Sequence, residues 1–285
     1  MADSIPRNGT GVRLARVRRI SIREHWRPEA PERELLCFES PAGDACVVAA
    51  ADSVAGTLAR RVAEGAAVDA GAAARALSAP ILDPGRPLPL RPVRVAKAWG
   101  EEHWFTGIEA RGVAAVGSDA ASVPLPWVLA AFPDACGGSE PPLLAKILAP
   151  SASPDTGDLY FEMHDAKEEV YVVTAIDPDA WPGGRGAVRY GFDQAARIRL
   201  GDAAFRLAFA NAAGANARAQ RRLGSARTRS GEPPDGPALE AARRARRRLR
   251  AFVHERPLAI GDVVRVPPRL PHGLLHGVRV VEFQT

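Results

Sequence analysis

Short apolar runs separated by turn residues open the chain. The run from Val12 to Ile22 mixes β-branched and basic residues, and the runs 34–39 and 45–49 flank the turn Ser40-Pro-Ala-Gly-Asp44. Helical spacing follows, with Asp52 and Asp69 placed to cap helices that extend to residues 65 and 79. The pattern predicts a small α+β unit, and nothing in it indicates catalysis.

Five prolines between residues 80 and 95 predict an extended linker. Beyond it, apolar runs typical of strands recur, and Ala-rich and Arg-rich segments with helical spacing interrupt them. A polar break is expected at 224–236. We therefore predict an N-terminal unit with its linker over 1–90 and a mainly β domain over 91–285, which carries a helical insertion at about 193–250. The strand runs are 141–148, 169–174, 188–190, 251–258, 262–266 and 278–283.

Candidate metal ligands lie in the stretch from Gly157 to Glu169. In a strand, Glu162 and His164 would point to the same face, because side chains two apart share a face. A turn into the following apolar run would bring Glu169 back toward them. Two carboxylates and an imidazole are suitable ligands for a divalent metal, but three ligands leave a site open.

A fourth candidate ligand, His272, ends the stretch Gly261-Asp-Val-Val-Arg-Val-Pro-Pro-Arg269-Leu-Pro-His272. Together the two stretches resemble the paired motifs of the cupin barrels, with Glu162 at the first histidine position and Arg269 at a glycine position. The resemblance implies a cupin (double-stranded β-helix, or jelly-roll) barrel. It also implies one bound divalent metal. In the alternative reading these four side chains are polar barrel residues without metal, which would leave buried carboxylates unpaired at high cost.

Composition narrows the class of protein. Hydrophobic residues make up 46% of the chain and charged residues 25%, an ordinary globular balance. Three cysteines without metal-type spacing suggest reduced thiols and a cytoplasmic location, and no apolar run is long enough to predict a membrane span. The net charge of +5 and the Arg-rich segment 243–250 raise the possibility of nucleic-acid binding. We expect instead a solvated helix, because its arginines surround the helix and no nucleic-acid motif accompanies them.

Lysine is rare in this arginine-rich chain. The three lysines are Lys97, Lys146 and Lys167. Unlike arginine, lysine is a compact charge that can exchange its proton, so these positions suggest a role that arginine cannot fill.

More specific motifs between Trp99 and Gln284 resemble those of the type I phosphomannose isomerases, which are zinc cupins with a helical insertion. The resemblance rests on Pro142-Leu-Leu-Ala-Lys146-Ile-Leu148, Glu162-Met-His164, Lys167-Glu-Glu169, Tyr190-Gly-Phe192, Gly261 to His272, and Val280-Val-Glu282-Phe-Gln284. It covers roughly two-thirds of the chain and leaves residues 1–90 outside. The family places glutamine where this chain has Glu162.

The family resemblance implies roles for individual residues. Glu162, His164, Glu169 and His272 would hold the metal, with Zn²⁺ as first choice and Mn²⁺ or Fe²⁺ as alternatives. Lys146, Lys167 and Glu282 would line a sugar-phosphate pocket. The chain ends at Thr285, before the position of a family pocket arginine, and Arg269 is the candidate that would supply this charge or else block the pocket.

The implied reaction is aldose–ketose isomerisation of a hexose phosphate through an enediolate. It needs a metal to polarise the substrate oxygens and a group that moves a proton between neighbouring carbons. Two alternatives remain open. One is a non-catalytic metal cupin that binds a sugar or sugar phosphate, and the other is a metal cupin of different chemistry, such as a dioxygenase or an epimerase. The sequence leaves the oligomeric state open.

Overall fold

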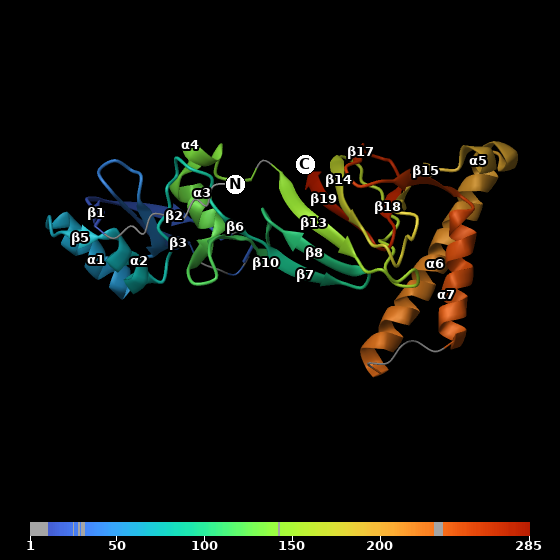
Figure 1. Ribbon diagram of the computed structural model, residues 1–285, viewed down its shortest axis with the longest axis horizontal. Coiled ribbons are helices and arrows are strands. Elements are labelled where there is room, and N and C mark those ends of the chain that lie inside the picture. The colour runs from blue at the N-terminus through green and yellow to red at the C-terminus, as the bar shows by residue number, and fades with distance from the viewer. Residues whose placement is uncertain (1–10, 25, 28, 30–31, 142, 231–235) are drawn as a thin grey trace. The chain divides into compact units, whose positions relative to one another are not determined.

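The computed structural model describes residues 11–24, 26–27, 29, 32–141, 143–230 and 236–285. The chain forms two compact units. The first comprises Met1–Val95 and His103–Lys146, and the second comprises Ala96–Glu102 and Ile147–Thr285. Figure 1 follows the chain through both units.

The first unit begins with the predicted α+β arrangement. Strands β2 (Arg16–Ile22), β3 (Arg33–Glu39) and β4 (Cys46–Ala50) form an antiparallel sheet in that order. Helices α1 (Ser53–Ala63) and α2 (Ala70–Leu77) are capped by the side chains of Asp52 and Asp69, which accept the amides of Ala55 and Ala72. The predicted hairpin and both caps are confirmed.

Shorter elements complete this unit around one apolar core. Strand β11 pairs with β6 and β12, β1 pairs with β5, and β9 pairs with β10. The bounds are β1 (Arg13–Leu14), β5 (Val68–Asp69), β6 (Leu90–Arg91), β9 (Ile108–Glu109), β10 (Gly112–Val113), β11 (Ala115–Gly117), β12 (Ser122–Pro124), α3 (Leu125–Ala131) and α4 (Pro133–Cys136).

The second unit contains strands of two antiparallel sheets, and three strands of the larger sheet are only partly within it. A six-stranded sheet has the order β17-β14-β19-β13-β8-β7, and a three-stranded sheet has the order β16-β15-β18. The bounds are β7 (Val93–Lys97), β8 (Gly100–Trp104), β13 (Leu144–Pro150), β14 (Glu169–Ile176), β15 (Gly186–Phe192), β16 (Val253–Leu258), β17 (Val263–Val266), β18 (His272–Leu274) and β19 (Val278–Gln284).

One apolar core unites the two sheets of the second unit. It contains Tyr171 of β14 and Val280 of β19 from the larger sheet, and Val188 of β15 and Leu274 of β18 from the smaller one. Two antiparallel sheets that enclose one core form a β-sandwich. The predicted fold class, mainly β with helical insertions, is confirmed.

The two faces of the β16-β15-β18 sheet have different neighbours. Val188 pairs with Leu274, and Tyr190 pairs with His272, so these four side chains share the face that turns to the core. Arg189 lies between them in sequence and therefore points to the opposite face. This alternation places His272 inside the sandwich and Arg189 outside it.

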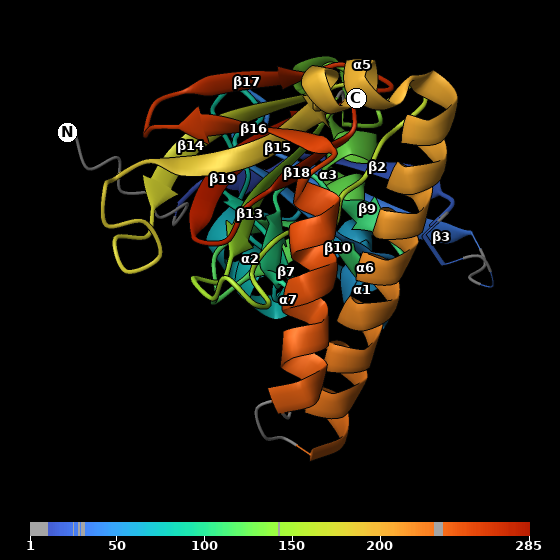
Figure 2. The ribbon, with the colours of Figure 1, turned by 90° about the vertical axis from the view of Figure 1, so that its right-hand side faces the viewer.

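The helical insertion consists of α5 (Gln194–Leu200), α6 (Asp202–Ser230) and α7 (Gly236–Arg250). Figures 1 and 2 show α6 and α7 running side by side. The sequence predicts a polar break from residue 224. This predicted start is wrong, because α6 continues through Ser230. The rest of that predicted break, 231–235, lies outside the described residues. Among the described helices, none combines the length and the apolar character needed to cross a membrane.

Candidate metal centre

Three predicted ligands converge at one end of the sandwich. Glu162, His164 and His272 each offer a ligand atom within 4.8 Å of the other two. The predicted strand through Glu162 and His164 is wrong, because this segment forms only an isolated bridge, at Glu162. A strand is unnecessary here, since the bridge partner is His272 itself and brings the ligands together directly.

Backbone hydrogen bonds position these side chains. The amide of Glu162 donates to the carbonyl of His272, and the amide of His272 donates back to Glu162, both at 2.9 Å. The amide of Arg269 donates to the carbonyl of His164 at 2.7 Å. Arg269 reaches this position with φ of +64°, in the left-handed region where the cupin pattern has glycine.

The ring of His272 is held in the orientation of a metal ligand. Its Nδ1 lies 2.9 Å from the carbonyl oxygen of Leu270, which can only accept, so Nδ1 carries a hydrogen. In the neutral ring the lone pair is then on Nε2, which faces the cluster. Metal-binding histidines are commonly fixed in this way by a backbone carbonyl.

The buried Nε2 atoms of His164 and His272 have no hydrogen-bond partner among the described residues. Both nevertheless approach the Glu169 carboxylate, His164 at 3.3 Å from Oε1 and His272 at 3.1 Å from Oε2. The two ring nitrogens thus lie close to opposite oxygens of one carboxylate. Glu162, His164 and His272 therefore fit a divalent metal, and the Glu169 carboxylate adjoins them.

Glu169 is buried, and three side chains besides His164 contact its carboxylate. Tyr171 donates its hydroxyl to Oε2 at 2.7 Å, and Lys167 places its ammonium 2.5 Å from Oε1. Burial would raise the pKa of Glu169, but His272, Lys167 and Tyr171 together hold it well below its usual range. The carboxylate is thus ionised at neutral pH, as metal binding requires.

The pKa values of the two histidines shift in opposite directions. Burial lowers the pKa of His164, and the neighbouring Lys167 charge lowers it further. Burial also disfavours the charged form of His272, but the Glu169 carboxylate and the Leu270 carbonyl outweigh it and raise the pKa. Protons would therefore compete with a metal ion for His272 more strongly than for His164.

The other predicted pocket residues are distributed over several elements. Lys167 adjoins the cluster and also donates to Gln284 at 3.2 Å. Glu282 is buried on β19 opposite Tyr171. Lys146 is half-buried on β13, and Arg269 is exposed. Their roles in binding or catalysis stay predictions.

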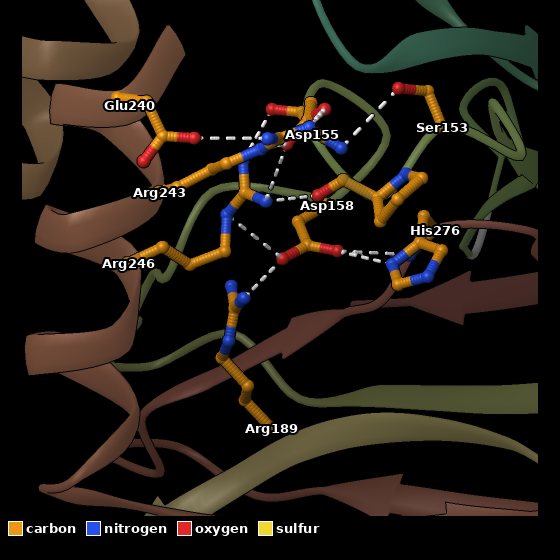
Figure 3. A network of polar contacts seen from close by, with 9 residues as sticks. Ser153, Asp155, Asp158, Arg189, Glu240, Arg243, Arg246 and His276 are labelled. Carbon is orange, nitrogen blue, oxygen red and sulfur yellow. Dashed lines mark hydrogen bonds and ion pairs between the residues drawn. The ribbon is translucent and has the colours of Figure 1, made fainter.

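Sequence reasoning missed Tyr171 as a partner of Glu169, although the i, i+2 spacing on β14 could have suggested it. It also missed a polar network that joins Asp155 and Asp158 to Arg189, Arg243 and Arg246, shown in Figure 3. No short-range spacing of residues in the sequence predicts that network, since its members come from a loop, a strand and a helix.

Neither a protein-family model nor a curated protein matches the chain. Among solved structures, the mannose 6-phosphate isomerase from Bacillus subtilis aligns at 16% identity with a TM-score of 0.43, covering 70% of this chain and 58% of that enzyme. A variant of phosphomannose isomerase from Salmonella typhimurium aligns at 14% identity with a TM-score of 0.39, covering 70% of this chain and 68% of that one. A mannose 6-phosphate isomerase bound with zinc and yttrium aligns at 14% identity and 0.38, covering 69% and 67%. Each of these alignments with a mannose 6-phosphate isomerase spans about 70% of the chain at low identity.

Proposed function

We propose that the protein is a metal-dependent aldose–ketose isomerase of the mannose 6-phosphate isomerase type. The observation that carries the proposal is the convergence of Glu162, His164 and His272 beside Glu169, with the Lys167 ammonium 2.5 Å from that carboxylate. The motifs around these residues resemble the isomerase family in sequence, and Lys167 falls on one of its sugar-phosphate pocket positions.

The metal would be held by Glu162, His164, Glu169 and His272. Imidazole nitrogens with carboxylates suit Zn²⁺, and the two carboxylates also accommodate Mn²⁺ or Fe²⁺. Once bound, such an ion polarises the substrate oxygens and favours loss of a proton beside the carbonyl.

The side chains around the ligands would bind the sugar phosphate and move its proton. Lys167 can hold or release a proton at Nζ, and its contact with Glu169 keeps that charge at the edge of the cluster. Lys146 and Glu282 would complete the pocket, as the family resemblance implies. Arg269, exposed three residues before His272, would supply positive charge to the phosphate or restrict access to it.

The test is interconversion of mannose 6-phosphate and fructose 6-phosphate by the metal-loaded protein. We expect turnover that disappears in His272→Ala and falls at least tenfold in Lys167→Met, which keeps the apolar stem and removes the charge. Arg269→Gly separates the two roles of that arginine, because a substitute for the family arginine predicts lower activity and a plug predicts higher activity.

The alternative is a non-catalytic metal cupin that binds a sugar phosphate. Metal content near one ion per chain, sugar-phosphate binding and no turnover in either the original protein or Arg269→Gly would establish it. Absence of bound metal after loading would contradict both the isomerase and the non-catalytic metal cupin.

A further inference from the structure

A cavity of about 600 Å³ lies on the outer side of the β16-β15-β18 sheet, between the loop 156–163 and the helical insertion. Arg189 of β15 lines it, as do residues of α6 and α7. This volume is in the range of small-molecule sites. Of the predicted metal ligands, Glu162 lines the cavity, whereas His272 faces the interior of the sandwich.

The walls of the cavity are largely apolar and aromatic. They include Trp99, Leu159, Phe161, Phe192, Phe209 and Leu249. Phe209 of α6 stands edge-on to Phe161 at 5.8 Å and to Phe192 at 4.9 Å, measured between ring centroids. These contacts hold the helix against the sheet and offer a surface that suits an apolar, ring-sized group.

One end of the cavity is charged. In Figure 3, Asp158 lies between the guanidinium groups of Arg189 and Arg246, and His276 contacts its other oxygen at 2.8 Å. Asp155, which also adjoins Arg246, is held by Arg243 through two hydrogen bonds of 2.9 and 2.8 Å. Because Arg243 also contacts Glu240 at 3.1 Å, three arginines face three carboxylates in this network, which places charged donors at the cavity without an excess of either charge.

Two buried polar atoms at the cavity have no hydrogen-bond partner among the described residues. They are Nε of Arg189, whose residue is only 3% exposed, and Oδ1 of Asn216 on α6. Both residues line the cavity. Leaving a charged donor and an amide acceptor buried without partners is costly, so their presence indicates a ligand that would satisfy them.

We propose that this cavity binds an organic anion with an apolar, ring-sized body. The acidic group, a carboxylate or a phosphate monoester, accepts from Arg189, and a donor on the ligand meets Asn216. The body packs on the aromatic walls. Arg189 lies on the face of β15 opposite His272, so the acidic group is bound away from that histidine, although Glu162 also lines the cavity.

Binding is measured by calorimetry on the full chain with three probes that each carry a phenolic donor: 4-hydroxyphenylacetate, its neutral analogue 4-hydroxyphenylacetamide, and 4-hydroxyphenyl phosphate. We expect saturable binding of one or both anions, and the better of the two identifies the acidic group. The amide should bind about tenfold more weakly or worse, since its oxygen accepts from Arg189 without the negative charge. Arg189→Met should weaken the anion by a similar factor, whereas Arg243→Met, in the same network but outside the cavity lining, should change it less than about twofold.

A second pair of variants keeps every charge in place. Ala213→Phe adds a ring inside the cavity and should abolish binding, whereas Ala210→Phe, exposed on the same helix, should not. No saturable binding of either anion, or unchanged binding in Ala213→Phe, would overturn the proposal. Binding lost in His272→Ala would assign the anion to the metal centre and overturn it as well. Anion binding that is retained in His272→Ala supports a separate site, whatever the outcome of the isomerase assay.

Discussion

The two faces of one small sheet carry two different kinds of polar site. On the inner face, His272 joins Glu162 and His164 in a group that could hold a metal, and the Glu169 carboxylate contacts both histidines. On the outer face, Arg189 joins Asp158 and Arg246, and opposite charges contact each other directly. The inner cluster gains most from a metal, whereas in the outer network three arginines are balanced by Asp155, Asp158 and Glu240.

The difference lies in what compensates the buried charge. On the inner face Lys167 compensates Glu169, but the two imidazole nitrogens have no hydrogen-bond partner among the described residues, so metal binding should couple to folding. A buried arginine and aspartate already form a pair, and removing one partner leaves the other uncompensated. Metal removal should therefore affect the inner face most, whereas mutation of the ion pair should affect the outer face most.

The largest expected effect is on the outer face. Asp158→Ala removes the contact of the buried Arg189 and should destabilise the protein by about 3–5 kcal/mol. Asp155→Ala, whose partner Arg243 is 42% exposed, should cost no more than about 1 kcal/mol. Urea denaturation measures both. Equal losses would mean that the outer charges are as solvated as surface pairs.

The next effect is on the inner face. His272→Ala removes a ligand and should weaken metal binding by more than the roughly 10–100-fold typical of losing a supporting contact. His276→Ala, which removes a histidine from the outer network, should leave metal content unchanged. Metal analysis after dialysis against a weak chelator distinguishes them. Full metal retention in His272→Ala would remove the site as described.

A pH prediction sharpens the comparison further. Burial would raise the pKa of Asp158, but His276, Arg189 and Arg246 together lower it to about 2. A depressed carboxyl pKa stabilises the fold above its unfolded value of about 3.9, and this stability is lost as the pH falls from about 4 to 2. The contribution is on the order of 2 kcal/mol.

Asp158→Asn should therefore show a shallower loss of unfolding free energy between pH 4 and 2 than the original protein. Denaturation at several pH values gives both slopes. Parallel slopes would show that Asp158 titrates normally and that the outer pair is not tightly formed.

The smallest effect concerns the loop beside the metal centre. Arg269 has φ of +64°, a conformation that costs a side-chain-bearing residue energy and glycine none. Arg269→Gly should raise the free energy of unfolding by less than about 1 kcal/mol, because the freer unfolded chain offsets part of the gain. Thermal and urea unfolding test this, and metal content should not change. A marked destabilisation would show that the arginine side chain itself holds the loop.

The sequence by itself determined the elements whose signals are local. The caps Asp52 and Asp69, the hairpin around Ser40–Asp44 and the helical insertion follow from neighbouring residues, and the structure has them. Three of the metal-ligand predictions followed from short fixed spacings, because Glu162, His164 and Glu169 lie within eight residues of one another. His272 came from a second motif, and the resemblance to known barrels joined the two.

Only the tertiary structure decided how the ligands meet. Glu162 and His164 reach His272 through a single bridge rather than a strand, and this depends on a pairing across more than a hundred residues. It also decided the outer cavity, where Asp158, Arg189 and Arg246 have no common spacing. The physical reason is that hydrogen bonds and ion pairs between distant segments depend on which face each residue turns. Register fixes that face, and a shift of one residue would exchange Arg189 with Val188.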